Sequence, residues 1–372
     1  MVRSDRLNIT HVTAPATVGG LESVVAALAA GLADRGHQVR IVALLGPHDR
    51  CLPFESLPGR GVEMVEVRLP PRSYAREGAR LIQTLTGSGR AVVHCHGFHA
   101  DVVGLRAARA VGLAAVSTVH GFVGGGWKGR FYEWIDRRAL RRFDGVVAVS
   151  KPLVEVLASA GVPRSRISLV PNGLSTADPP LDRHAARQAL GLPPDGLICG
   201  WVGRLSFEKG PDVLVRALPQ IPKEWSASVV GLGELGDQLR HQAGILGVTD
   251  RIRWHGVVPH AGRLLAAFDA LILSSRTEGT PMVVLEAMAA RVPLIVTTVG
   301  GVPDVVSAHE AILVPPDAPQ ALADALTRLT REPDGARTRV EKAAQRLQSE
   351  FSASAWLDRH ESLYRQLAPA RR

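Results

Sequence analysis

Two glutamates, Glu278 and Glu286, flank the point where a polar loop changes into a helical segment. The apolar run 271–273 before them has the length of a strand that is buried on both faces of a parallel sheet. The Ala- and Met-rich segment 281–291 begins with Pro, as helices often do. A helix that starts directly after a strand presents unpaired N–H groups to an anion. The spacing predicts a phosphate site flanked by two carboxylates, although either glutamate could serve only to balance the helix dipole.

Arg204 and Lys209 lie in a second loop of this kind, 203–210, after the apolar run 197–202. A helix is expected from about Pro211, so this loop also follows the carboxyl end of a strand. A forked guanidinium and a compact ammonium together suit the oxygens of a diphosphate. The two residues predict an anion site, and the alternative is a pair of surface cations.

Four histidines of the first half are candidate binding or catalytic residues. His120 follows the apolar run 115–119, so we expect it at a strand's carboxyl end, facing the crevice where ligands collect. It could instead bond only to neighbouring backbone. Three more, His94, His96 and His99, are expected in the loop after the fourth strand. His-Cys-His suggests a metal, but no complete ligand set accompanies it, so we expect loop histidines that hold backbone or an acceptor.

Apolar runs alternate with helical segments along the whole chain, which predicts a doubly wound parallel sheet in each half. The strands expected in the first half are the runs 7–12, 38–45, 62–67, 91–95, 115–119 and 145–149. A glycine pair, Gly19-Gly20, precedes the first expected helix, 21–35. Backbone without Cβ lets a phosphate approach closely at such a place, although the pair could also form only a turn.

The chain has 372 residues, 46% of them hydrophobic, which is enough for two domains with their own cores. We expect the boundary near Asn172, because the polar, Pro-rich stretch 175–196 follows it. No apolar run has the length of a membrane-spanning helix, and the N-terminus lacks the apolar region of a secretory signal. Three scattered cysteines form no C-x-x-C pair, so a reduced cytoplasmic setting is expected.

The excess of positive charge lies entirely in the first half. Residues 1–172 hold 22 Lys and Arg against 13 Asp and Glu, and residues 173–372 hold 22 against 22. The segment Trp127 to Phe143 combines an apolar face with several arginines. It could rest on an anionic membrane surface or pack on the sheet as an ordinary helix. The charge favours an anionic partner, but a genome that prefers Arg would give the same excess.

Several of these motifs together resemble one enzyme family. E-G-T-P-x-x-x-L-E-A-M-A, from Glu278, resembles the E-x7-E signature of glycosyltransferase family 4, the retaining sugar-nucleotide transferases of the GT-B fold. Further motifs at matching positions are G-G-x-E from Gly19, T-x-H-G around His120, P-N-G at 171–173, G-R-x-x-x-x-K-G at 203–210 and G-G-x-x-D at 300–304. The last has Asp304 where the family has Glu. The resemblance extends from Gly19 to Pro303.

The resemblance implies two Rossmann-like domains, 1–172 for the acceptor and 173–348 for the nucleotide sugar, facing a central cleft. The tail 349–372 would return to the first domain as a helix. It also implies transfer of a hexose-type sugar to a glycan or lipid-linked acceptor, in cell-envelope or polysaccharide biosynthesis. No metal, cofactor or nucleic acid is expected. The place implied is the cytoplasm, with attachment to the inner face of the membrane as one option.

The resemblance also assigns roles to individual residues. The catalytic set is His120, Arg204, Lys209 and Glu278. The donor-binding set is Gly19, Gly20, Arg204, Lys209, Gly233, Val257, Glu278, Gly279, Thr280, Pro281, Met282, Val283 and Glu286. The acceptor set is Glu22, His96 and His120.

Two other functions fit the same motifs, namely a sugar-nucleotide 2-epimerase of similar fold and a catalytically silent binding subunit. A nicotinamide dehydrogenase is disfavoured, because the first expected strand is not followed by G-x-G-x-x-G. The sequence also contains no D-x-D motif for a divalent cation, so Arg204, Lys209 and the helix near Pro281 are expected to stabilise the leaving diphosphate.

Overall fold

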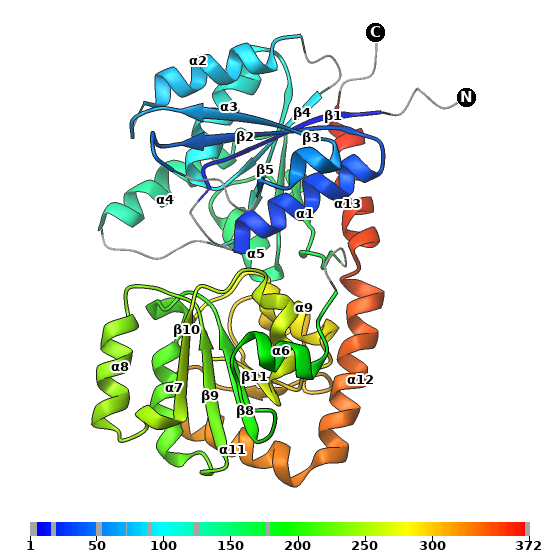
Figure 1. Cartoon of the computed structure of the whole chain (residues 1–372). Coiled ribbons are helices and arrows are strands. Elements are labelled where there is room, and N and C mark those ends of the chain that lie inside the picture. Colours follow the sequence, from blue (N-terminus) through cyan, green and yellow to red (C-terminus); the bar gives the residue numbers. More distant parts are fainter. Residues whose placement is uncertain are drawn as a thin grey trace. The chain divides into compact units, whose positions relative to one another are not determined.

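The structure is a computed structural model that describes residues 6–15, 20–49, 54–71, 73–87, 91–121, 127–175 and 179–368, with the backbone alone in 127–133. The chain forms two compact units, Met1–Gly173 with Ala353–Arg372, and Leu174–Ser352 (Figure 1). The expected limits were 1–172 with 349–372, and 173–348. Each unit is an α/β unit with one sheet, which confirms the predicted fold class.

The first unit contains a seven-stranded sheet in the order β3-β2-β1-β4-β5-β6-β7, parallel throughout. Its strands are β1 (Asn8–Thr13), β2 (Gln38–Leu45), β3 (Val62–Arg68), β4 (Ala91–His96), β5 (Ala114–Val119), β6 (Gly145–Ala148) and β7 (Ile167–Leu169). Its helices are α1 (Gly20–Asp34), α2 (Tyr74–Leu85), α3 (Phe98–Ala110), α4 (Trp127–Leu140), α5 (Lys151–Ser159) and α13 (Ala353–Leu367). The strand order reverses between β1 and β4, which is where open α/β sheets bind ligands.

The last helix, α13, packs on the other elements of the first unit. Arg35, at the end of α1, donates to Asp358 at 2.7 Å and to Glu361 at 2.8 Å. Tyr364 of the same helix is fully buried and bonds to His94 of β4 at 2.6 Å. The helix therefore supplies both surface ion pairs and a buried contact to the first sheet.

The second unit contains a six-stranded parallel sheet in the order β10-β9-β8-β11-β12-β13. Its strands are β8 (Leu197–Val202), β9 (Trp225–Val230), β10 (Ile252–Gly256), β11 (Ala270–Leu273), β12 (Leu294–Thr297) and β13 (Ile312–Val314). Its helices are α6 (Arg183–Ala189), α7 (Pro211–Ala217), α8 (Gly236–Ile245), α9 (Met282–Ala289), α10 (Val302–Val305), α11 (Pro319–Arg331) and α12 (Pro333–Glu350). Here the order reverses between β8 and β11.

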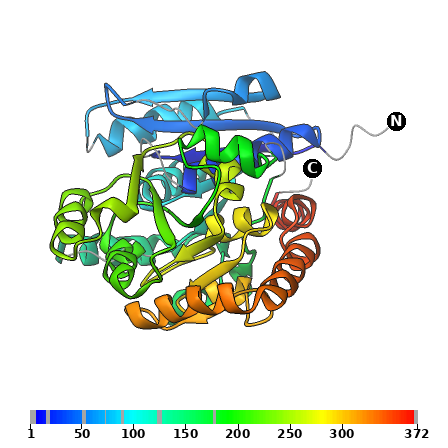
Figure 2. The same ribbon diagram turned by 60° about the horizontal axis from the view of Figure 1, so that its bottom comes forward.

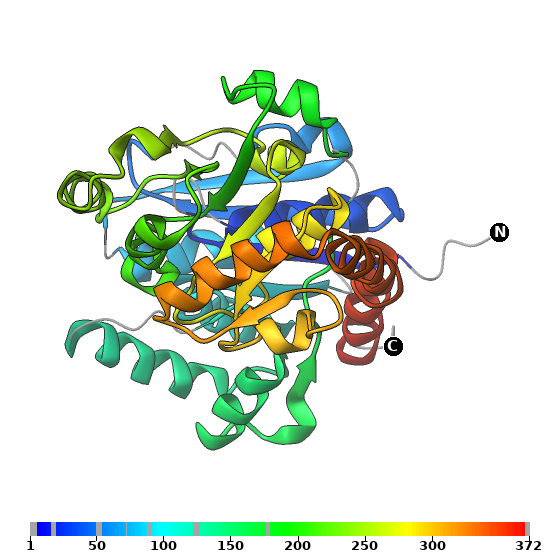
Figure 3. The same cartoon turned by 90° about the horizontal axis from the view of Figure 1, so that it is seen from below.

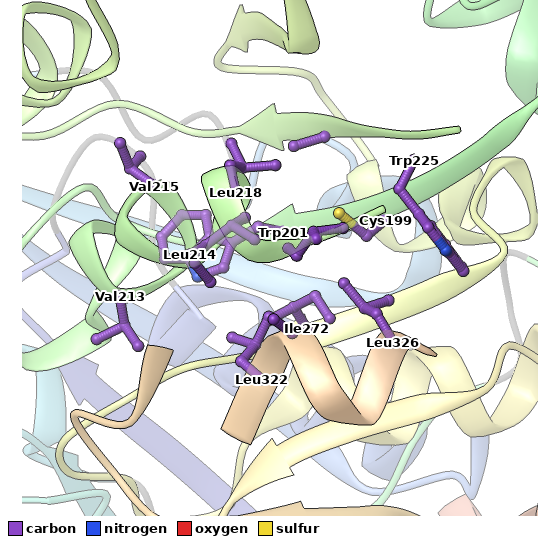
Figure 4. Packing of buried hydrophobic residues seen from close by; sticks show 14 of the residues in the cluster. Cys199, Trp201, Val213, Leu214, Val215, Leu218, Trp225, Ile272, Leu322 and Leu326 are labelled. Carbon is purple, nitrogen blue, oxygen red and sulfur yellow. The ribbon is translucent and has the colours of Figure 1, made fainter. Parts of the chain in front are cut away.

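Apolar side chains cover both faces of the second sheet, as the continuous apolar runs of its strands require. On one face, residues of α7, α8 and α11 pack against Trp201 and Ile272, and Figure 4 shows this cluster. On the other face, residues of α6, α9 and α12 pack against Leu271 and Val296. Helices α11 and α12 (orange in Figures 2 and 3) contact one another. Packing on both faces therefore fixes the sheet, and with it the starting points of the loops at its carboxyl edge.

Candidate active site

The loops after β8 and β11 leave two adjacent strands at the reversal of the second sheet. The strands pair through Ala270 with Cys199 and Leu271 with Gly200. Because the chain winds in opposite directions from this point, the carboxyl ends of the two strands lie where open α/β sheets bind their ligands. Arg204 and Lys209 come from the first loop and Glu278 from the second, so the fold brings the predicted residues of two distant motifs to one place.

Lys209 and Glu278 form the central ion pair of this edge. The ammonium Nζ donates to Oε1 at 2.8 Å and to Oε2 at 2.9 Å, and Ser275 Oγ also donates to Oε1, at 2.7 Å. The Glu278 side chain is only 6% exposed, against 34% for Lys209. The carboxylate is therefore fixed and poorly hydrated, while the ammonium still has a face open to a ligand.

The backbone next to Lys209 is held against β11. Ser274 Oγ donates to the carbonyl of Gly210 at 2.7 Å and accepts from the indole N–H of Trp201 at 3.0 Å. Gly210 has a φ of 62°, and a Cβ there would lie 2.2 Å from the carbonyl oxygen of Ser274. Only glycine fits this position, because the two chain segments touch through their backbones. Trp201 is anchored in the core shown in Figure 4.

The backbone of Glu278 is held from the other side by the turn after β12. Gly301 N–H donates to the carbonyl of Glu278 at 3.0 Å. Gly300 has a φ of 49°, and a Cβ on it would lie 2.1 Å from that same carbonyl oxygen. The glycine pair of the G-G-x-x-D motif thus lets two loops touch.

Arg204 and Gly233 lie in two loops that are joined through their backbones. Leu205 N–H donates to the carbonyl of Leu232 at 3.0 Å, and Leu235 N–H donates to the carbonyl of Leu205 at 3.0 Å. A Cβ on Gly233 would lie 2.3 Å from the Leu205 carbonyl oxygen. The Arg204 side chain is exposed and has no ion pair with any residue that the structure describes. Its backbone is fixed, and its guanidinium remains available to an anion.

Helix α9 begins one residue later than predicted. Pro281 is its N-cap, and Val284 N–H donates to the Pro281 carbonyl at 3.0 Å. The N–H groups of Met282 and Val283 have no partner inside the helix, as in any first turn. Gly279 and the buried Thr280 precede it. The helix also ends earlier, at Ala289, because the backbone turns into the left-handed region at Arg291, with a φ of 56°.

Glu286 lies farther along α9 and is partly buried. Loss of hydration raises its pKa to about 7. A Cβ on Gly262 would lie 2.6 Å from the Glu286 carboxyl carbon, so the space for this carboxylate depends on a glycine that the sequence analysis did not name. Val257, which follows β10, is 46% exposed.

The remaining predicted residues belong to the first unit. Gly20 is the exposed first residue of α1, and Glu22 is buried in the first turn of that helix. Gly19 lies outside the described residues. His120 directly follows β5, as predicted, and burial lowers its pKa to about 4, so it is neutral at pH 7.

The expectation that His94 and His96 lie in a loop is wrong. Both are buried within β4, and only His99 comes after it. They point to the same side of the strand, because side chains alternate along it. There they meet His11 of β1 and Tyr364 of α13. His11 Nδ1 and His96 Nε2 share a hydrogen bond of 3.0 Å.

The resulting group extends further into the first unit. His94 bonds through one nitrogen to Tyr364 at 2.6 Å and through the other to Thr118 at 2.7 Å. Burial lowers the pKa of His11 to about 3 and those of His94 and His96 well below the usual value. Among the described residues, His11, His94 and His96 have nitrogens within 4.8 Å of one another, close enough to hold a metal ion. The sequence alone does not connect His11 with the other two histidines, because it lies far from them along the chain.

Most of the arginine-rich segment Trp127 to Phe143 forms α4, and the described part of this helix has an exposed aromatic residue. The side chain of Trp134 is 56% exposed, and the guanidinium of Arg138 lies 5.5 Å from the centre of its ring. Within the described residues, no helix is both long and apolar enough to cross a membrane.

Family comparisons agree with this geometry. Residues 182–347 match the family described as Glycosyl transferases group 1, and residues 18–178 match Glycosyltransferase Family 4. The D-inositol 3-phosphate glycosyltransferase of Actinosynnema mirum is 30% identical over 379 residues, covering 85% of this chain and 84% of the relative. The glycogen synthase of Mycobacterium tuberculosis is 27% identical over 374 residues, covering 91% and 88%.

Comparison with solved structures gives the same fold. Anabaena HepE, crystallised in complex with UDP and glucose, superimposes with a TM-score of 0.84 at 22% identity, covering 97% of this chain and all of the other. The two matched families together span most of both units, and the pairing of Lys209 with Glu278 lies at the expected edge of the second sheet. The chain therefore belongs to glycosyltransferase family 4, and it is a glycosyltransferase of the GT-B type.

Proposed function

We propose that this enzyme is a metal-independent, retaining glycosyltransferase that moves a hexose-type sugar from a nucleotide diphosphate sugar to a glycan or lipid-linked acceptor. The observation that carries the proposal is the Lys209–Glu278 pair beside the loop that leads to α9. It places a cation, a carboxylate and a helix N-terminus within one strand-end region. This is the set needed to hold a diphosphate next to a sugar.

In the proposed reaction, the bond between the sugar's anomeric carbon and the diphosphate oxygen breaks, and the diphosphate leaves with the electron pair. Arg204, Lys209 and the first-turn N–H groups of α9 stabilise the negative charge that develops. The acceptor hydroxyl then bonds to the anomeric carbon and passes its proton to the oxygen of the departing diphosphate. The predicted role of Glu278 is to accept hydrogen bonds from sugar hydroxyls, and that of Glu286 is to accept from the ribose.

The way in which Glu278 is held supports the proposed retention of the anomeric configuration. Its carboxylate is bonded by Lys209 and Ser275, which favours charge balance over attack on the anomeric carbon. In the proposed retaining route no covalent sugar–enzyme intermediate forms, and the acceptor approaches from the side on which the diphosphate leaves. His120 is predicted to act on the sugar or acceptor. Its neutral imidazole can both donate and accept a hydrogen bond at pH 7.

The names of the relatives support a nucleotide-sugar donor and leave the acceptor open. HepE was crystallised with UDP and glucose, and the two sequence relatives are named for an inositol phosphate and for glycogen. A phosphorylated, lipid-linked or polymeric acceptor in cell-envelope or polysaccharide biosynthesis fits the basic first half of the chain. We place the enzyme in the cytoplasm, attached to the inner membrane face through that half.

A donor panel tests the proposal. Purified protein is incubated with UDP-glucose, UDP-N-acetylglucosamine, GDP-mannose and ADP-glucose, with and without EDTA, and release of nucleoside diphosphate is measured. One donor should be hydrolysed slowly, with the same rate in EDTA. Lys209→Ala and Arg204→Ala should each lose roughly 10²–10³ in rate, as when an oxyanion donor is removed. Lys223→Ala, an exposed lysine at the amino end of the same sheet, is the control and should keep full activity.

The panel also separates the alternatives. Loss of turnover in EDTA would overturn metal independence, and an epimer formed from donor alone would identify a 2-epimerase instead. Failure to bind or hydrolyse any donor would favour a silent binding subunit. Retention is checked by NMR of the anomeric proton in the transfer product, where an inverted configuration would refute it.

A further inference from the structure

Ser275 is a buried residue next to the site that the family motifs do not include. It follows β11 and is 1% exposed. Its hydroxyl donates to Glu278 Oε1 at 2.7 Å, and its carbonyl accepts from Thr297 Oγ1, also at 2.7 Å. Thr297 is the last residue of β12, so two adjacent strands hold Ser275. The hydroxyl therefore reaches Glu278 from a rigid position.

The two oxygens of Glu278 are not equivalent. A carboxylate oxygen has two lone-pair directions for hydrogen bonds. Oε1 accepts from both Ser275 and Lys209, whereas among the described residues Oε2 accepts from Lys209 alone, at 2.9 Å. One lone pair of Oε2 is thus left for a ligand, while both of those on Oε1 are in use.

We propose that Ser275 is a positioning residue that occupies Oε1 and so presents Oε2 of Glu278 to a hydroxyl of the donor sugar. The inference rests on the proposed function. Ser275 does not touch the sugar. When the diphosphate draws Lys209 toward itself, Ser275 remains the fixed partner that keeps the carboxylate in place. It acts on the sugar half of the donor and leaves the nucleotide half unaffected.

The test compares Ser275→Ala and Ser275→Cys with wild type, using the donor that wild type turns over in the panel and its nucleoside diphosphate. Loss of one hydrogen bond to a charged group should lower kcat by about tenfold or more. Affinity for the nucleoside diphosphate, measured by calorimetry, should not change. Ser275→Thr keeps the hydroxyl and should recover part of kcat, and Ser226→Ala, on β9, is the control.

A double-mutant cycle separates positioning from general damage. Calorimetric affinity for the nucleotide sugar should fall in Ser275→Ala, and it should fall no further when Ser275→Ala is added to Glu278→Ala. Additive losses, an equal loss of nucleoside diphosphate affinity, or an unchanged kcat in Ser275→Ala would overturn the inference. Absence of turnover in wild type would instead refute the proposed function on which it rests.

Discussion

Glu286 is the site carboxylate whose charge changes within the working pH range, because burial raises its pKa to about 7. Ribose hydroxyls donate to the ionised form, so donor binding should favour loss of the proton. Affinity should therefore rise with pH up to about 7 and level off above it, by up to about tenfold per pH unit on the acidic side.

Calorimetry with a nucleotide sugar from pH 5.5 to 8.5 checks this, because its diphosphate carries the same charge over that range. Glu286→Gln cannot ionise and should show a flat profile. An equal slope in the variant and in wild type would mean that another group titrates. Titration of His120 does not account for such a slope, since its pKa of about 4 lies below the measured pH range.

At the residue scale, the sequence predicted the identities of the central pair and missed what fixes them. Lys209 and Glu278 could be found because each follows a strand and precedes a helix. Ser275 and Ser274 have no comparable signal, since a serine after a strand is common and its partner is set only by the pairing of β11 with β8 and β12. Gly262 was missed for the same reason, because its contact to Glu286 crosses two elements.

Helix α4 is the element that bears on membrane attachment. Its described part has the exposed Trp134 with Arg138 against the ring, and Arg137 and Arg142 lie nearby in sequence. An indole at the headgroup level and basic residues near anionic lipid favour surface binding. The protein should therefore sediment with vesicles of phosphatidylglycerol and phosphatidylcholine at low salt, and much less with phosphatidylcholine alone.

The double variant Trp134→Ala/Arg138→Gln should weaken vesicle binding several-fold. The loss of the arginine alone should reduce the binding free energy by roughly 1 kcal/mol. Arg331→Gln, a surface substitution at the end of α11, removes one charge elsewhere and serves as the matched control. Equal sedimentation of the double variant and the control would exclude α4 as the contact surface.

Element boundaries show where local pattern is sufficient. Strand β2 was predicted at its observed limits, because Gly36 precedes the apolar run and Gly46 follows it. The composition of 175–196 predicts a polar connection, yet this stretch contains α6, which Asp182 caps by accepting from Ala185 N–H at 2.9 Å. The Asp182 cap and the contacts of Arg187 stabilise this short helix, although its sequence pattern is weak. Arg187, nearly fully buried, donates to backbone carbonyls and to Asp269. Such long-range contacts are not readable from local composition.

At the scale of the whole molecule, the buried histidines of the first unit link stability to pH. His11, His120 and His360 have pKa values lowered to about 3, 4 and 4, and the pKa values of His94 and His96 are lowered well below the usual value. Their unfolded forms take up protons near pH 6.5, whereas the folded forms resist. The free energy of unfolding is therefore highest above about pH 6.5 and falls as the pH drops below it, by about 1 kcal/mol per pH unit for each histidine.

Hydrogen–deuterium exchange of the β1 and β4 amides at pH 7.5 and 5.5, corrected for intrinsic rates, measures this in the first unit alone. Protection should fall steeply on acidification. His360→Phe removes one titrating group from the set and should reduce the slope. An unchanged slope would show that the histidines are not its source.

The chain's end lies against its beginning, since Arg35 of α1 is bound by Asp358 and Glu361 of α13. On the ribosome, residues 1–173 emerge long before this last helix exists. The segment 174–352 is continuous and can fold as soon as it is made. The segment 1–173 must wait for α13, with His94 lacking its tyrosine partner, so this unit is completed after the unit that follows it in the sequence.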